Sequence, residues 1–358
     1  MILSIGDTNM SDERQLRNRV KASRDGRGWS QEELAQRAGI SRASVSAIEI
    51  HRLVPSVAAA MALAKAFGCG VEDLFGVGDD MVEERWAWQN PSVPCRFWRA
   101  KVGNRILRYP AELTVAGMLP HDGILEPDEQ RIVREGNPER TLVMASCDPA
   151  AGLVASEYER ATGFRLLPLH RSSREALNLL RQGLVHVAGI HLASAENESG
   201  NACAAKAILG EGFSLLRLAT WDEGLAVGRS KSSVGAVLRA NLRWVGRELG
   251  AGARQCQDEI LGNRPEPRRL ARNHSGVAEA IRCGWADVGV CLRLVSDQAG
   301  LGFIHVRNEA YDLCFPTAFE SDPRIRKLLE LLRSPSTRSL FASLPGYELS
   351  RSIETRAI

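Results

Sequence analysis

The sequence of residues 30–48 predicts two short helices joined by a tight turn, and this restricts the possible folds more than any other feature. Ser30 and Glu33 have the S-x-x-E spacing of a capping box, which is typical of the start of a helix. Gly39 can adopt the left-handed conformation that ends this helix, and Ser41 can cap the next one directly. Apolar residues follow helical spacing: Leu34, Ala35, Ala38, Ile40, Val45 and Ile48. The pattern predicts a helix-turn-helix inside a small all-α domain over residues 1–78.

Residues 16–75 resemble the Cro/lambda-repressor-like family, also called the xenobiotic response element type, across its whole five-helix domain. The resemblance rests on these segments: Trp29-Ser30-Gln31-Glu32-Glu33-Leu34-Ala35, Gly39-Ile40-Ser41, Ile48-Glu49 and Val54-Pro55-Ser56. It implies that the second helix of the motif lies in the major groove of double-stranded DNA, and that a homodimer reads two half-sites. A helical bundle with a merely solvated polar face is the alternative.

Residues on the outer side of the second helix are the candidates for DNA contact. Val45 and Ile48 define its buried side, so Arg42, Ala43 and Ser46 point away from the core. Arginine can form two hydrogen bonds to guanine, alanine can touch a thymine methyl group, and serine can bond several base edges. A helix N-terminus such as that at Gln31 commonly meets a phosphate. The full set of DNA-binding candidates is Gln31, Ser41, Arg42, Ala43, Ser44 and Ser46.

Charge supports a local rather than a chain-wide DNA contact. The chain of 358 residues carries 46 Lys and Arg against 43 Asp and Glu, so its net charge is only +3. Between residues 13 and 55, however, nine basic residues face five acidic ones. This local excess predicts a modest attraction to phosphates.

The eight cysteines form no C-x-x-C pair and no short metal-ligand cluster, so we expect reduced thiols, no metal and no cofactor. His186 and His191 lie five residues apart at the two ends of a predicted strand, so they point to opposite faces and are not expected to share a metal. No signal sequence and no apolar run of about 18 residues is recognisable, which favours a cytoplasmic protein.

A change of composition after residue 75 predicts a domain boundary. Glycine, aspartate, tryptophan and proline residues dominate the next stretch, and we expect residues 79–140 to be a linker and irregular connecting segment. From residue 141 to 358, short β-branched runs alternate with amphipathic segments, which is typical of a mainly parallel α/β domain. Strands are predicted at 142–145, 165–169, 186–190, 243–246, 286–290 and 303–306, and helices at 152–162, 174–182, 253–261, 276–283 and 323–332.

Four predicted strand-to-helix turns deliver small, polar or hydroxyl residues to a helix N-terminus, two in each half of this region. They are Ser146-Cys147-Asp148, Arg171-Ser172-Ser173, Gly250-Ala251-Gly252 and Asn273-His274-Ser275. In open α/β sheets, ligands bind beyond the carboxyl ends of the strands, and free N–H groups at helix ends favour anions. Two such halves facing each other would form a cleft.

The order of these elements is similar to that of the two-lobed periplasmic-binding-protein-like domain found in helix-turn-helix regulators. The matching segments are Ala145-Ser146-Cys147-Asp148-Pro149, 185–192, Trp221-Asp222-Glu223-Gly224-Leu225, 247–254 and Gly284-Trp285-Ala286-Asp287-Val288-Gly289. The resemblance implies a ligand sensor whose ligand is an oxyanion such as molybdate or an acidic metabolite. Two hydroxyl residues of the usual pattern are replaced by Ala251 and Ala253. The ligand-binding candidates are Ser146, Cys147, Asp148, Ser172, Ser173, Arg247, Gly252, Arg254 and Ser275.

These features favour a one-component transcription regulator in which a small effector modulates DNA binding. No nucleophile elbow, P-loop or Ser/Cys–His–acid constellation is recognisable in the sequence, so we do not expect an enzyme. Two alternatives stay open: an α/β enzyme with an autoregulatory DNA-binding module, and a DNA-binding dimer whose large domain binds no ligand.

Overall fold

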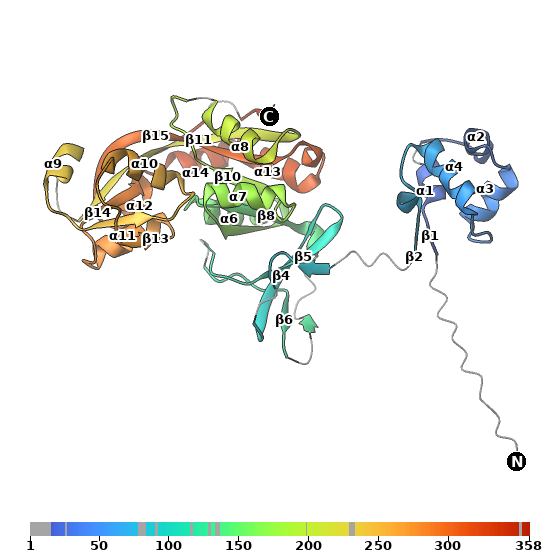
Figure 1. Ribbon diagram of the computed structural model, residues 1–358, viewed down its shortest axis with the longest axis horizontal. Helices are drawn as coiled ribbons and strands as arrows, with labels where there is room; N and C mark the ends of the chain where they lie inside the picture. The colour runs from blue at the N-terminus through green and yellow to red at the C-terminus, as the bar shows by residue number, and fades with distance from the viewer. Residues whose placement is uncertain are drawn as a thin grey trace, which may run out of the picture. The chain divides into compact units, whose positions relative to one another are not determined.

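The computed structural model describes residues 16–25, 27–77, 84–89, 92–114, 117–127, 130–132, 137–197, 199–228, 233–350 and 353–358. The chain divides into two compact units, residues 1–82 and 83–358 (Figure 1). Within the described residues, no helix is long and apolar enough to cross a membrane.

The first unit contains the helix-turn-helix expected from the sequence. Its helices are α1 (Val20–Asp25), α2 (Gln31–Ala38), α3 (Arg42–Glu49), α4 (Val57–Phe67) and α5 (Val71–Leu74). The capping box at Ser30 is formed in both directions, and Gly39 ends α2 with φ of 66°. Leu34, Val45 and Ile48 are fully buried in the core between the helices. Two short strands that were not expected, β1 (Leu16–Asn18) and β2 (Phe75–Val77), pair antiparallel and close the unit.

The expectation of an irregular segment over residues 79–140 is wrong for much of that range. The strands β3 (Glu84–Trp86), β4 (Cys95–Val102), β5 (Arg105–Pro110), β6 (Gly123–Leu125) and β7 (Gln130–Ile132) form one sheet in the order β3-β5-β4-β6-β7. The sheet is held by packing as well as pairing, because Trp98 and Tyr109 are fully buried against the α/β region. The Tyr109 hydroxyl donates to the carbonyl of Leu184 at 2.7 Å.

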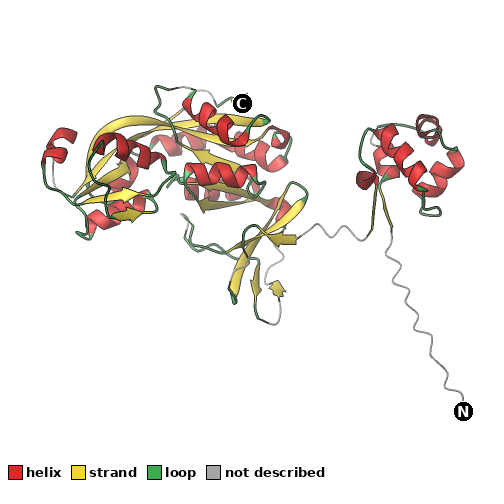
Figure 2. Ribbon diagram, viewed as in Figure 1, coloured by secondary structure: helices red, strands yellow, loops and turns green. Residues whose placement is uncertain are grey.

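The remainder of the second unit is a two-lobed α/β fold. Its central sheet has the order β13-β12-β14-β11-β15-β10-β8-β9. The first lobe contains β8 (Thr141–Ser146), β9 (Arg165–His170) and β10 (Val187–Ile190), with the helices α6 (Ala151–Thr162), α7 (Ser173–Arg181), α8 (Gly200–Leu209), α13 (Pro323–Arg333) and α14 (Pro335–Ala342). The second contains β12 (Trp244–Arg247), β13 (Arg269–Ala271) and β14 (Val288–Leu292), with α9 (Val234–Arg239), α10 (Gly252–Leu261), α11 (His274–Arg282) and α12 (Arg293–Gln298). Helices cover both faces of the sheet in each lobe (Figure 2).

Two long antiparallel strands run through both lobes and connect them. They are β11 (Phe213–Val227) and β15 (Gly302–Pro316), and their pairing extends over almost their whole length. The short strands β16 (Tyr347–Leu349) and β17 (Thr355–Ala357) add to β11. Charged residues interrupt the apolar pattern in the middle of both long strands. For that reason the sequence analysis missed β11 and detected only one end of β15.

Candidate functional site

The helix α3 presents the predicted DNA-contacting residues as expected for a recognition helix. Arg42 and Ala43 are exposed, and Ser46 is half-buried. The hydroxyl of Ser41 accepts a hydrogen bond from the backbone N–H of Ser44 at 3.0 Å and lies 2.8 Å from the Ser44 hydroxyl. Ser41 and Ser44 therefore cap the helix, and Arg42 is left as the longest exposed side chain in its first turn.

Gln31, the predicted phosphate contact, is fixed by a buried ion pair. Its side-chain amide donates to Glu49 at 2.8 Å, and Arg24 bonds the same carboxylate at 2.6 Å. Burial works to raise the pKa of Glu49, but the bonds from Arg24 and Gln31 outweigh it and lower the pKa below its ordinary value. This network ties the start of α2 to the end of α3, so it orients the two helices of the motif.

In the second unit, the polar side chains at the junction of the two lobes surround His191. This residue follows β10, whereas Cys147 follows the neighbouring parallel strand β8, so both stand at carboxyl ends of strands. The sulfur of Cys147 lies 2.9 Å from His191 Nε2. His191 Nδ1 lies 2.5 Å from a carboxylate oxygen of Glu309, which comes from the middle of β15. The three side chains form one buried line of hydrogen bonds.

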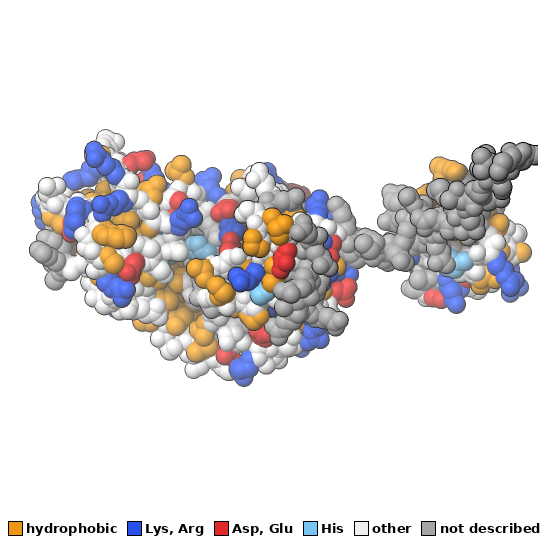
Figure 3. All heavy atoms as spheres, turned by 90° about the horizontal axis from the view of Figure 1, so that it is seen from below, with side chains coloured by type: hydrophobic (Ala, Val, Ile, Leu, Met, Phe, Trp, Pro, Cys, Tyr) orange, Lys and Arg blue, Asp and Glu red, His pale blue; other side chains and the backbone are white. Residues whose placement is uncertain are grey.

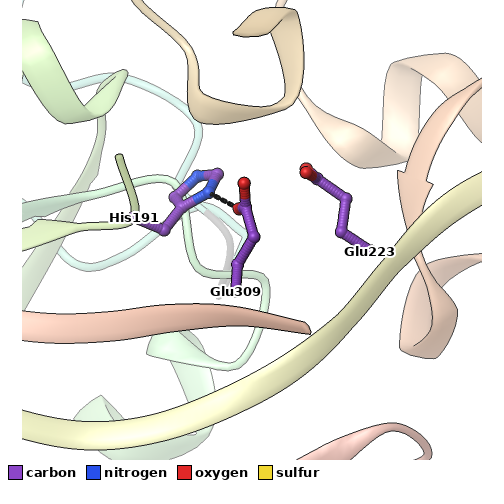
Figure 4. Close-up of side chains that lie close together, drawn as sticks. All are labelled: His191, Glu223 and Glu309. Atoms are coloured by element: carbon purple, nitrogen blue, oxygen red, sulfur yellow. Dashed lines mark hydrogen bonds and ion pairs between the residues drawn. The ribbon is translucent and has the colours of Figure 1, made fainter. Parts of the chain in front are cut away.

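A second buried carboxylate, Glu223 of β11, points to the same region (Figure 4). Arg307 lies 2.5 Å from Glu309 and 3.2 Å from Glu223. Burial and the neighbouring Glu309 raise the pKa of Glu223 well above its ordinary value. Burial alone would raise the pKa of Glu309 too, but His191, Glu223 and Arg307 lower it to about 2. Burial and charge thus shift the pKa values of the two carboxyls in opposite directions, so Glu223 holds a proton more tightly than Glu309 does.

Ligand atoms of His191, Glu223 and Glu309 lie within 4.8 Å of one another, which is close enough to hold a metal ion. The sequence analysis expected no metal, and these residues are far apart in the chain. Arg307 already supplies the positive charge beside both carboxylates. A divalent cation would have to displace this guanidinium, so the cluster is better described as an internal ion-pair network.

The predicted ligand-binding residues of the first lobe are engaged in this same region. The hydroxyl of Ser146 lies 2.7 Å from that of Tyr311, and the Ser173 hydroxyl accepts from the backbone N–H of His191 at 3.1 Å. Asp148 accepts from the Tyr347 hydroxyl at 2.6 Å, and burial raises the pKa of Asp148 to about 6. Ser172 accepts from the N–H of Glu175 at 3.4 Å and so acts as a helix cap.

The second lobe meets this cluster through the N-terminus of α10. A Cβ atom at Gly252 would lie only 2.1 Å from the carbonyl oxygen of His191 and 2.5 Å from its Nδ1, so only glycine permits this approach. No side chain caps this helix at Ala251. The backbone N–H of Arg174 also donates to the carbonyl of Gly250 at 3.5 Å, which joins α7 to the glycine turn of the other lobe.

Arg247 and His274 belong to the second lobe, at the end of β12 and the start of α11. Arg247 is fully buried and lies 3.2 Å from His274 Nδ1. Burial and Arg247 hold the pKa of His274 well below its ordinary value, so its ring is neutral and carries its proton on Nε2. The rings of His274 and His191 are 6.2 Å apart.

Two predicted residues do not join this cluster. Arg254 bonds Asp258 at 2.7 Å and Glu266 at 2.5 Å, and it lines an open pocket of about 730 Å³ beside the glycine turn. Ser275 is exposed and lines another pocket, of about 600 Å³, together with His170 and Arg171. Pro149, Arg171 and Asn273 line the same pocket, so residues in or next to three of the four predicted turns border it, and a ligand bound there stays a prediction.

Several residues of the cluster were not among the ligand-binding candidates, although Trp221 and Glu223 lie in a segment that matches the family pattern. These are Trp221, Glu223, Arg307, Glu309 and Tyr311, all on the two long strands. Charged residues flanked by strand-forming ones, as in 221–223 and 307–309, were the signal that could have identified them. His186, by contrast, is structural as expected: it accepts from the N–H of Val143 at 3.0 Å and contacts the carbonyl of Lys101 at 2.9 Å.

Comparison with known proteins supports both parts of this architecture. Residues 155–333 match the family model of a PBP superfamily domain, and residues 20–74 match a helix-turn-helix model. The uncharacterized protein YvgK of Bacillus subtilis (strain 168) is 29% identical over 230 residues, which is 60% of this chain and 74% of that protein. The HTH-type transcriptional regulator YgzD of the same organism is 38% identical over 65 residues, which is 18% of this chain and 98% of that protein.

Among solved structures, the chain is similar to a putative phosphate ABC transporter substrate-binding protein with bound phosphate from Clostridium perfringens. It has a TM-score of 0.47 and 10% sequence identity, and the similarity covers 59% of this chain and 100% of the other. Both resemblances expected from the sequence are confirmed by the family matches. The chain belongs to the PBP superfamily domain family, and it carries this domain behind a helix-turn-helix domain of the Cro/lambda-repressor-like type.

Proposed function

We propose that this protein is a one-component transcription regulator. Its helix α3 reads the major groove of DNA, and a small ligand bound between the two lobes modulates that binding. The observation that carries the proposal is the presence in one chain of a complete helix-turn-helix and of two lobes that meet around one buried polar cluster. We also propose that it acts in the cytoplasm, as the sequence analysis expected.

The hydrogen-bonding pattern at the junction favours a ligand with acceptor oxygens. Among the described residues, the buried Trp221 Nε1 and His274 Nε2 have no hydrogen-bond partner. The Trp221 ring lies 5.1 Å from that of His191, so both unpartnered donors belong to rings next to the same imidazole. An oxyanion such as molybdate, or the carboxylate of an acidic metabolite, would satisfy donors of this kind.

Ligand binding changes DNA affinity only if the ligand prefers one arrangement of the lobes. The N-terminus of α10 and His191 are in contact across the junction, so opening of the lobes would break this contact. We propose that ligand stabilises the closed arrangement, with an allosteric coupling of about 1–3 kcal/mol.

Thermal-shift and calorimetric titration of the full chain with molybdate, phosphate and small dicarboxylates tests this function. We expect saturable stabilisation without turnover by one ligand class. Trp221→Phe removes the indole N–H and should weaken binding of that ligand by about 1 kcal/mol, or roughly five-fold in affinity. The matched control is Trp285→Phe, because Trp285 is 62% exposed. Turnover of a bound compound, or unchanged affinity in Trp221→Phe, would contradict the proposal.

A further inference from the structure

The hydrogen bonds around His191 define which atoms donate and which accept. Glu309 is ionised at neutral pH, so it can only accept, and His191 Nδ1 must donate to it. Burial works against a charged ring, yet Cys147 and Glu309 raise the pKa of His191 well above its ordinary value. Both ring nitrogens then carry a proton. His191 Nε2 therefore donates to the sulfur of Cys147 at 2.9 Å.

The other buried cysteines are in different surroundings. Cys291 points its sulfur at the carbonyl oxygen of His274 at 3.6 Å, so it acts as a donor and keeps its proton. Burial raises the pKa of the Cys291 and Cys314 thiols to about 12. Burial, together with the nearby Glu223, also raises the pKa of the third one, Cys256, above its ordinary value. The nucleophilic form of cysteine is the thiolate, which an adjacent imidazolium stabilises and an apolar surrounding does not. Cys147 is thus chemically distinct from its buried counterparts.

We propose that Cys147 is a site of oxidation by a hydroperoxide, with His191 as the proton donor. The thiolate sulfur attacks one peroxide oxygen, an S–O bond forms and the O–O bond breaks. The sulfur loses two electrons and becomes a sulfenic acid, while the peroxide is reduced to an alcohol, or to water from hydrogen peroxide. The leaving oxygen takes the proton from His191 Nε2, and Glu309 stabilises the ring during the transfer.

The position of Cys147 favours a small oxidant over a bulky electrophile. The residue is only 2% exposed, and Gly252 of the other lobe packs directly on His191. A peroxide transfers a single oxygen atom, whereas a carbon electrophile would leave a larger group in this confined space. The unpartnered N–H groups of Trp221 and His274 belong to the rings beside His191.

Oxidation would also alter the junction of the lobes. An oxygen atom on the sulfur lies between Cys147 and His191 and breaks their 2.9 Å contact. Gly252 of the other lobe packs against the His191 ring. The ring therefore cannot move away from Cys147 unless the lobes separate. This consequence for DNA binding rests on the proposed function, whereas the chemistry at Cys147 does not.

The experiment treats the reduced full-length protein with hydrogen peroxide in the presence of dimedone, which traps sulfenic acids, and measures each cysteine peptide by mass spectrometry. We expect Cys147 to be labelled on the order of ten-fold or more faster than Cys291 and Cys314 in the same molecule. Cys147→Ser should lose the fast label, and Cys291→Ser should keep it. Glu309→Gln, with folding checked by circular dichroism, should slow labelling and shift its pH profile.

Labelling of Cys147 no faster than of Cys291 in the folded wild-type protein overturns the proposal without needing any variant. A separate arm measures affinity for operator DNA before and after oxidation, in the wild type and in Cys147→Ser. Fast labelling with unchanged DNA affinity overturns the regulatory consequence alone. If no reduced sample, wild type or variant, binds operator DNA, the result would instead contradict the proposed function.

Discussion

Arg42 is the residue whose substitution should affect recognition of the DNA base sequence most directly. It is exposed in the first turn of α3, where a guanidinium can form two hydrogen bonds with guanine. We expect Arg42→Ala to cost about 1–3 kcal/mol on the preferred operator and to relax one base position. Fluorescence anisotropy with specific and scrambled DNA measures both effects.

The control for Arg42 is Arg52→Ala, which removes the same charge from an exposed position just after α3. This change should weaken binding to specific and to scrambled DNA equally, since it affects only the attraction to phosphates. If Arg42→Ala behaves in the same way, Arg42 contacts no base edge.

His186 should make the stability of the second unit depend on pH. Burial and the neighbouring Arg324 lower the pKa of His186 from its ordinary value of 6.5 to about 3. The folded state therefore keeps the ring neutral. The free energy of unfolding has its full value above pH 6.5, and it decreases as the pH falls from 6.5 towards 3, because the unfolded state gains a proton that the folded state does not bind. The loss is on the order of 1.4 kcal/mol per pH unit within this window.

Urea unfolding at several pH values measures this slope, with His186→Gln as the test variant. Glutamine can still accept from Val143 but cannot gain a proton, so the slope between pH 6.5 and 3 should decrease. A slope that is identical in both proteins would assign the pH dependence to other groups.

At the scale of elements, the contact between α10 and His191 determines whether the lobes can close. We expect Gly252→Ala to separate them, because the new methyl group would lie 2.1 Å from a backbone oxygen that cannot move aside freely. The cost should be about 1–3 kcal/mol, as for other overpacked sites. Small-angle scattering should show a larger radius of gyration, and ligand affinity should fall.

Gly235→Ala provides the comparison for this element. A methyl group there would meet only the flexible end of Arg239, at 3.2 Å. This variant should keep the wild-type dimensions and ligand affinity. Equal behaviour of the two variants would show that the α10 contact does not control closure.

At the scale of the whole molecule, we propose that the protein is a homodimer, because one short recognition helix reads few base pairs and two half-sites need two copies. The first unit has an apolar surface on α4, where Val57 is 77% and Met61 is 60% exposed. These two residues are four apart and share one side of α4. Figure 3 shows both Lys/Arg and Asp/Glu side chains on one face of the larger unit.

Sedimentation of Val57→Asp tests whether a second copy covers this surface. We expect the variant to be monomeric and to lose operator affinity by at least ten-fold, because each copy would then bind its half-site alone. Gln36→Asp, which places the same charge on an exposed position of α2, should remain dimeric. A wild-type protein that sediments as a monomer both free and on DNA would contradict the dimer.

The sequence by itself determined the elements whose signals are local. The capping box at Ser30 and the turn at Gly39 depend on residues within one helical turn of each other, so they could be recognised without tertiary contacts. The α/β alternation from residue 141 onward is local as well. It predicted β8, β9, β10, β12, β14 and one end of β15, but not β11 or the three-residue strands β13, β16 and β17.

Only the tertiary structure decided what surrounds His191. Cys147, His191 and Glu309 are separated by 44 and 118 residues and come together because β8, β10 and β15 are neighbours in one sheet. A buried charge has no local signature beyond its interruption of an apolar run, and its partner is chosen by strand order and register. The pairing of residues far apart in the chain is set by packing, so neither the line of hydrogen bonds nor the close approach of Gly252 could be derived from spacing.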